Sequence, residues 1–168
     1  GRIDGCKLTS INRVFGGGNA ASTPSTKVTV NGTFEINEVF GGGNGDGCES
    51  AHVGFHKYTT DKADQMYGFG KAEVVIGASN INYVYGASND DGNVRQVAIA
   101  TLDNVGGCEF NVGKAYGGGK KAPIDGRAIL NLGCVDNVGD VYGGAEEADI
   151  HNDIELNITN GTYDRVYD

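Results

Sequence analysis

Apolar and polar residues alternate along the chain in short runs that are separated by glycine and asparagine. Alternating or β-branched runs of this length are typical of β-strands, because successive side chains of a strand point to opposite faces. Outside one inserted segment, no stretch keeps a helical period. The pattern therefore predicts an all-β fold. The clearest runs occupy residues 28–30, 74–76, 97–99, 130–132 and 156–158.

A valine or alanine, an aromatic residue and a run of small residues recur together along the chain. The motif reads VFGGGN at 14–19 and 39–44, VYGASN at 84–89, AYGGGK at 115–120, VYGGAE at 141–146 and VYD at 166–168. Its aromatic residues are separated by 25, 45, 31, 26 and 25 positions. These spacings indicate a period near 25 residues, with insertions of about twenty and about six residues.

A period of this length, holding two or three short strands and glycine-marked turns, predicts one coil of a parallel β-helix, or β-solenoid. About five to six coils would stack at about 4.8 Å, the spacing of paired strands. The expected organisation is a single domain over residues 1–168, with one long loop insertion at about 45–71. Residues at the same phase would form ladders along the stacking axis.

The small residues after each aromatic are expected to form the corner of a coil. Glycine would turn the chain there through φ values that other residues resist, and asparagine also tolerates the left-handed region. Asn19, Asn44 and Asn89 end three of the runs, and their side-chain amides could bond from coil to coil. Lys120 and Glu146 take this place in the next two coils, so the ladder is expected to stop there. Stacked asparagines of this kind resemble the ladders of right-handed parallel β-helices.

The V-[FY]-G-G-G-N motif, with V-x-V-x-G ahead of it, resembles the glycine-rich repeats of large adhesin-like surface proteins of gut Bacteroidetes. The resemblance implies a secreted or cell-surface bacterial protein. It also implies a non-catalytic structural or adhesive role, with carbohydrate or a surface protein as the partner. The last motif stops at 166–168 and no polar cap is evident. The chain is therefore expected to be a fragment of a longer repeat array, or to associate end to end.

The aromatic ladder is the most systematic candidate binding feature. Valine and aromatic are adjacent, so they point to opposite faces of a strand. If the valines face the core, the aromatics form an outward stripe that could stack on sugar rings or contact a partner. If the aromatics fill the core, the valines face outward. Structural stacking is favoured over ligand contact for the six residues Phe15, Phe40, Tyr85, Tyr116, Tyr142 and Tyr167.

An acidic segment near the C-terminus is a candidate calcium site. EEADIHND places Glu146, Glu147, Asp149 and Asp153 close together, and carboxylate oxygens at this density could hold calcium. Neither EF-hand spacing nor a GGxGxD nonapeptide accompanies them. A solvated acidic loop is therefore favoured, and no other cofactor is expected.

The insertion carries Cys48, His52 and His56 in C-x3-H-x3-H spacing. Residues four apart share one face of a helix, so this spacing could direct three ligands at zinc. Gly54 interrupts the segment, and no fourth ligand is near in sequence. A surface loop is therefore favoured over a zinc site.

The alternative function is a polysaccharide-active enzyme, a lyase or a hydrolase, on the same fold. Its acid and base would come from Asp90, Asp91 and Asp103, with Arg95 close in sequence. Paired carboxylates are what glycosidic bond cleavage requires. However, the segment NDDGN is ordinary turn composition, and no Ser-His-Asp pattern is present. A non-catalytic role is favoured.

Two cysteines share one phase of the repeat. Cys108 lies eight residues before Tyr116, and Cys134 lies eight residues before Tyr142. Stacked coils would bring their Cα atoms to about 4.8 Å, which is within disulfide range. The phase therefore predicts neighbouring positions, occupied either by a disulfide or by two unpaired thiols.

Composition excludes several classes of protein. The net charge of −9 disfavours nucleic acid as a partner, because a polyanion requires a basic footprint. With 39% hydrophobic residues the chain does not have the composition of a disordered protein. No apolar run is long enough to span a membrane.

Overall fold

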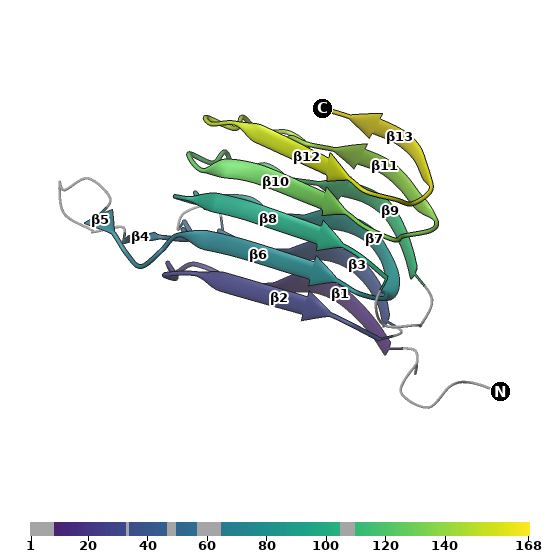
Figure 1. Cartoon of the computed structure of the whole chain (residues 1–168). Helices are drawn as coiled ribbons and strands as arrows, with labels where there is room; N and C mark the ends of the chain where they lie inside the picture. Colours follow the sequence, from purple (N-terminus) through teal and green to yellow (C-terminus); the bar gives the residue numbers. More distant parts are fainter. Residues whose placement is uncertain (1–8, 33, 47–49, 57–64, 105–109) are drawn as a thin grey trace.

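The computed structural model describes residues 9–32, 34–46, 50–56, 65–104 and 110–168. These residues form thirteen strands and no helix, which confirms the all-β prediction (Figure 1). In the described part of the chain there is accordingly no helix long and apolar enough to cross a membrane. The strands are β1 (Thr9–Phe15), β2 (Thr26–Val30), β3 (Phe34–Phe40), β4 (Phe55–His56), β5 (Gln65–Met66), β6 (Lys71–Ile76), β7 (Ser79–Tyr85), β8 (Val97–Leu102), β9 (Phe110–Tyr116), β10 (Arg127–Leu132), β11 (Val138–Tyr142), β12 (Ile154–Ile158) and β13 (Tyr163–Tyr167).

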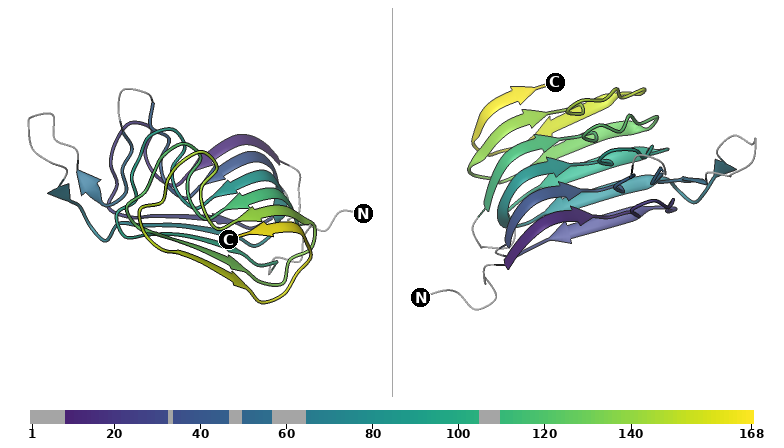
Figure 2. Two further views of the ribbon diagram at one scale, coloured as in Figure 1. Left: turned by 90° about the horizontal axis from the view of Figure 1, so that it is seen from above. Right: turned by 180° about the vertical axis from the view of Figure 1, so that it is seen from behind.

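Two parallel sheets make up most of the structure. The six-stranded sheet has the order β1-β3-β7-β9-β11-β13, and the five-stranded sheet has the order β2-β6-β8-β10-β12. Apart from the short antiparallel pair β4–β5, the chain alternates between the two sheets. Each strand therefore pairs with the strand one repeat further along, and Figure 2 shows the corresponding strands stacked one behind another. A third, narrower column consists of parallel bridges that join Thr23 to Val53, Val53 to Val94, and Ile124 to Ile150.

The hydrophobic core lies between the two sheets. Every second residue of β6, β8 and β10 is buried, as expected for strands with one face on a core. Because the pairing is in register, each core position recurs along the stack as an apolar column. One such column from the five-stranded sheet contains Val30, Ile76, Leu102 and Leu132, all buried.

The structure decides between the two orientations that the sequence left open. Val39, Val84 and Val141 lie in the core between the sheets. The adjacent aromatic residues form a separate cluster on the opposite face of the six-stranded sheet. We call this face, which points away from the core, the outer face.

The glycines of the motif do not turn the chain through left-handed φ values, so that prediction is wrong. Positive φ occurs at Gly32, Gly45, Gly54, Gly68, Gly70 and Gly161, and none of these is among the glycines that follow the motif's aromatic residues. The asparagines that end three of the motifs do not have positive φ either. The reason for glycine is instead close packing between repeats. A Cβ atom at Gly16, Gly41, Gly86 or Gly117 would overlap the carbonyl oxygen of the corresponding glycine in the next repeat.

The predicted asparagine ladder at the corners is confirmed. Asn44 donates a side-chain hydrogen bond of 2.6 Å to the Asn19 amide oxygen, and Asn89 donates one of 2.8 Å to that of Asn44. The series stops at Lys120, as expected, because its ammonium group binds a carboxylate on the outer face instead.

Part of the predicted insertion belongs to the repeat. Residues 50–53 pair with the neighbouring repeat, through the bond from Ala51 N to Asp91 O at 3.0 Å and from Val53 N to Asn93 O at 2.8 Å. The β4–β5 segment that follows projects from the stack (Figure 1). The Arg95 guanidinium holds its base by donating to the carbonyl oxygens of Gly54 at 3.0 Å and Phe69 at 2.9 Å.

Candidate functional site: the outer face of the six-stranded sheet

The outer face consists of side-chain columns that run along the stacking axis, because the six strands pair in register. The aromatic column contains Phe15, Phe40, Tyr85, Tyr116, Tyr142 and Tyr167. The charged column beside it contains Arg13, Glu38, Tyr83, Lys114, Asp140 and Arg165. Two polar columns follow: Asn12, Asn37 and Asn82 in one, and Ser10, Glu35, Asn80 and Asn111 in the other.

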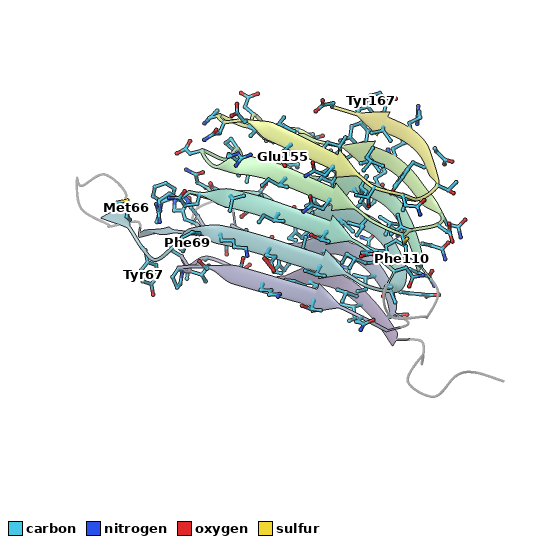
Figure 3. All side chains as sticks on the ribbon, viewed as in Figure 1. Met66, Tyr67, Phe69, Phe110, Glu155 and Tyr167 are labelled. Atoms are coloured by element: carbon cyan, nitrogen blue, oxygen red, sulfur yellow. The ribbon has the colours of Figure 1, made fainter. Side chains whose placement is uncertain are left out.

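The aromatic column is one continuous stack. Its ring centroids lie 4.9, 4.7, 5.1, 4.7 and 4.8 Å apart, and neighbouring ring planes are within 8° of parallel. Phe40 and Tyr85 are fully buried and Tyr116 is 5% exposed. The inner rings therefore have their faces covered by one another, which gives them a packing role. Ligand contact stays a prediction for the partly exposed Phe15, Tyr142 and Tyr167, of which Tyr167 is 44% exposed on β13 (Figure 3).

Ion pairs neutralise the two buried carboxylates of the charged column. The Glu38 side chain is 4% exposed and accepts hydrogen bonds of 2.8 Å from both Arg13 Nε and Lys120 Nζ. Burial alone would raise the pKa of this carboxyl, but the hydrogen bonds and charges of Lys120 and Arg13 outweigh it and hold the pKa below its ordinary value. Arg165 pairs with Asp140 through two bonds of 2.9 and 2.8 Å, and this pairing lowers the pKa of Asp140.

Two tyrosines of the stack have hydroxyls in a protected environment. The Tyr85 hydroxyl donates to the Glu146 carboxylate, which comes from a loop two repeats further along. Burial and this hydrogen bond raise the pKa of Tyr85 far above its ordinary value. Burial and the nearby Glu146 charge also raise the pKa of Tyr116. Both hydroxyls therefore stay protonated, and the Tyr85 hydroxyl helps to fix the loop over the stack.

The four residues of the predicted calcium site do not converge. Among the described residues, no group of three or more His, Cys, Asp or Glu side chains could hold a metal ion. Glu146 is engaged with Tyr85, while Glu147, Asp149 and Asp153 are exposed. Calcium binding stays a prediction that the geometry does not support.

The zinc candidates fall partly outside the described residues. Cys48 lies in the undescribed segment 47–49, and the side chain of His56 is not described. His52 is buried, and its Nδ1 accepts a hydrogen bond of 2.9 Å from the Asn93 backbone N–H. This nitrogen thus serves to join two neighbouring repeats.

The candidate catalytic residues occupy separate structural positions. Asp91 accepts a hydrogen bond of 2.7 Å from the Ser50 hydroxyl, and Asp103 accepts one of 3.1 Å from the Cys134 backbone N–H. The six-residue strand β8 lies between these two aspartates, a length of about 20 Å. Arg95 is committed to the base of the β4–β5 segment. The structure does not bring these groups into one site.

The predicted cysteine pair is only half described. Cys134 is exposed and free, and its sulfur accepts a bond of 3.5 Å from the Asn160 amide. Cys108 lies in the undescribed segment 105–109. Cys134 is therefore unpaired in this structure, and its neighbourhood with Cys108 stays a prediction.

Two adjoining hollows on the outer face were not predicted from the sequence. The larger, of about 610 Å³, lies between the two polar columns, over the backbone of Ile11 and Ile36. The smaller, of about 380 Å³, contains Tyr83, Gly113 and Lys114. Both are lined by Asn37 and Asn82, so they adjoin at these two side chains, and we call the two hollows together the asparagine groove.

A ladder of amides forms one wall of the asparagine groove. Asn82 donates a hydrogen bond of 3.1 Å to the Asn37 amide oxygen, and Asn37 donates one of 3.4 Å to that of Asn12. Each of the three precedes the aromatic residue of its motif by three positions. That constant phase is the signal by which the wall could have been found in the sequence.

Comparison with protein-family models, with curated proteins and with solved structures found no match to this chain.

Proposed function

We propose that the chain is a β-solenoid segment with a non-catalytic structural or adhesive role in a secreted or cell-surface bacterial protein. The observation that carries this proposal is the in-register pairing of every repeat with the next, which turns each motif position into a column along one axis. Such a chain is a rigid rod whose surface repeats one chemical pattern.

The solenoid interpretation is supported by the path of the chain. The chain passes from one parallel sheet to the other and returns one strand spacing further along the axis. The isolated bridges at Val53 and Ile124 add a third side to this path. A path that repeats in this way is what the coils of a β-solenoid require, and it supports this interpretation.

The non-catalytic role is supported by how the ionisable side chains are used. The buried Glu38 and Asp140 are neutralised by cations and brace the outer face. Asp91 and Asp103 each accept a hydrogen bond that joins neighbouring repeats. A glycoside-cleaving enzyme instead needs two carboxylates that flank one bond of the substrate. The polysaccharide-active enzyme is therefore the weaker alternative.

The adhesive part of the proposal is supported by the outer face, where polar side chains recur from repeat to repeat beside a groove. A repeated surface binds a repeated partner through many weak contacts, and a carbohydrate or a surface protein has this character. The resemblance of the motif to adhesin-like repeats points in the same direction.

The test is retention of the full chain on immobilised polysaccharides and on extracts of surface proteins, combined with an assay for cleavage of the same polysaccharides. Retention without release of shortened products supports the proposal. Cleavage at a rate that depends on Asp91 or Asp103 would replace it with the enzyme. Failure to be retained by any of these surfaces would remove the adhesive role.

A further inference from the structure

We propose that the asparagine groove binds an uncharged, extended polysaccharide whose chain runs along the stacking axis. The inference rests on the proposed adhesive role and adds the ligand class and the site. The groove lies on the outer face between the Asn12–Asn37–Asn82 column and the column of Ser10, Glu35 and Asn80.

The amide ladder leaves hydrogen-bonding groups for a ligand. A side-chain amide carries two N–H donors and an oxygen with two lone pairs. Within the ladder, Asn37 uses one N–H toward Asn12 and one lone pair toward Asn82. One donor and one lone pair of Asn37 thus remain on a side chain that lines both hollows. Sugar hydroxyls both donate and accept, and they are matched to such a mixed surface.

The spacing of the ladder favours a polymer over a single sugar. Asn12, Asn37 and Asn82 stand on adjacent parallel strands β1, β3 and β7, about 4.8 Å apart along the axis. A chain of identical sugars that lies along this axis presents a similar hydroxyl to each amide in turn. A monosaccharide would reach only part of the ladder and would therefore bind more weakly.

The smaller hollow supplies an aromatic surface. Tyr83 is half-buried and packs beside Tyr85, with ring centroids 6.3 Å apart. Tyr83 lines the smaller hollow beside Gly113, which takes the position after Asn82 along the stacking axis. Because glycine has no side chain, the hollow is open at this position. An apolar ring with a polar hydroxyl suits contact with a sugar, which has apolar C–H faces and polar edges.

The charge of the groove indicates that the polysaccharide is uncharged. Of the residues that line the two hollows, only Glu35 is acidic and only Lys114 is basic. A polyanion would meet no basic cluster there and would be repelled by the net charge of −9. A neutral glycan brings no charge of its own that would have to be desolvated in the groove.

Affinity electrophoresis tests the proposal. The full chain is run through native gels that contain a neutral β-glucan, a mannan or, as the anionic comparison, polygalacturonate. We expect at least one neutral polysaccharide to retard the protein, and the N37A/N82A double variant to bind it about tenfold more weakly, since it loses about two hydrogen bonds.

The chain offers a matched control. Asn157 donates a hydrogen bond of 2.9 Å to Asn131 in an exposed amide ladder of the five-stranded sheet. N157A removes the same kind of bond outside the groove and should leave retardation unchanged. If the double variant does not fold, E35R replaces it, because Glu35 is exposed, and arginine there would fill the larger hollow without breaking the ladder.

Each result has a distinct meaning. Loss of retardation in N37A/N82A or E35R but not in N157A supports the site. Equal retardation of all variants, or stronger retardation by polygalacturonate, would overturn it. Retention on a surface protein but on no neutral polysaccharide would overturn this inference and leave the adhesive role. No retention on any surface would overturn both.

Discussion

Gly41 packs against Gly86 of the neighbouring repeat so closely that a Cβ atom at Gly41 would overlap the Gly86 carbonyl oxygen. The same relationship holds between Gly86 and Gly117 and between Gly117 and Gly143. In each case the glycine N–H also donates to the backbone carbonyl oxygen of the aromatic residue in the next repeat, as in the bond of 2.9 Å from Gly41 N to Tyr85 O. The first glycine of the motif therefore exists for contact between backbones.

We expect Gly86→Ala to lower the free energy of unfolding by about 1–3 kcal/mol, the cost of overpacking. The added methyl would meet the Gly117 carbonyl oxygen, which shares its peptide group with Gly118 N and cannot move without disturbing the bond of 3.0 Å from Gly118 N to Gly144 O. The matched control is Gly144→Ala, where the added Cβ meets only Ile154 Cδ1 at 3.7 Å. Urea denaturation of both variants measures the difference. Equal stability of the two would refute the packing explanation.

The sequence allowed the all-β class and the ladders to be predicted, because stacking of repeats forces the same residue types to return at the same phase. The asparagine ladder that begins at Asn19 is an example, and the replacement of asparagine by Lys120 also predicts where the ladder ends. The prediction of left-handed φ values at the motif's glycines is wrong. Glycine serves both for unusual φ and for close approach, and a sequence does not distinguish these two uses.

The contacts of the outer face were less accessible from the sequence. Glu38 binds Lys120 across 82 positions, and Tyr85 binds Glu146 across 61 positions. Neither separation is a single period of about 25 residues, so no pattern within one repeat indicates these pairs. The sequence did not indicate the asparagine groove, because Gly113 follows Asn82 in the stack and ends the amide ladder after three repeats. Three asparagines are too few to stand out as a repeating pattern in the sequence.

Glu38 should make the protein sensitive to acid. Its folded-state pKa lies below the ordinary value of 4.5, so its stabilising contribution is present above that pH and is lost as the pH falls through the folded pKa. Glu38→Gln should cost about 1–3 kcal/mol at neutral pH, because the neutral amide leaves Arg13 and Lys120 without their carboxylate.

The pH dependence separates this effect from general destabilisation. Between neutral pH and about pH 3, urea denaturation of E38Q should show a smaller loss of stability than the wild type, since one linked carboxyl is absent. Glu35→Gln, at an exposed position of the same strand, is the matched control for the loss of one carboxylate. A slope for E38Q identical to that of the wild type would contradict the assignment.

Cys134 should react with iodoacetamide in the native protein, because its thiol is exposed and free. Peptide mass spectrometry locates the label, and Cys134→Ser provides the control for labelling elsewhere. Labelling that appears only after reduction would instead demonstrate a disulfide, with Cys108 as the partner that the coil phase predicts.

Tyr85 and Glu146 should form a coupled pair across two repeats. Tyr85→Phe keeps the ring in the stack but removes the hydroxyl that donates to Glu146, so we expect a loss of about 1–2 kcal/mol. Tyr142→Phe is the control, because its ring is stacked in the same column and its hydroxyl bonds to no described residue. It should stay within about 0.5 kcal/mol of the wild type.

Alkaline pH provides the second measurement on this pair. Burial and Glu146 raise the folded-state pKa of Tyr85 above its ordinary value of 10.0. Its contribution is therefore fully present below that pH and is lost as the pH rises above it, because the unfolded chain then releases a proton that the folded chain retains. The wild type should lose stability steeply above about pH 10, and Y85F less steeply, in urea denaturation. A double-mutant cycle with Glu146→Gln should give a coupling energy of about 1 kcal/mol, and additive effects would show that the pair is not coupled.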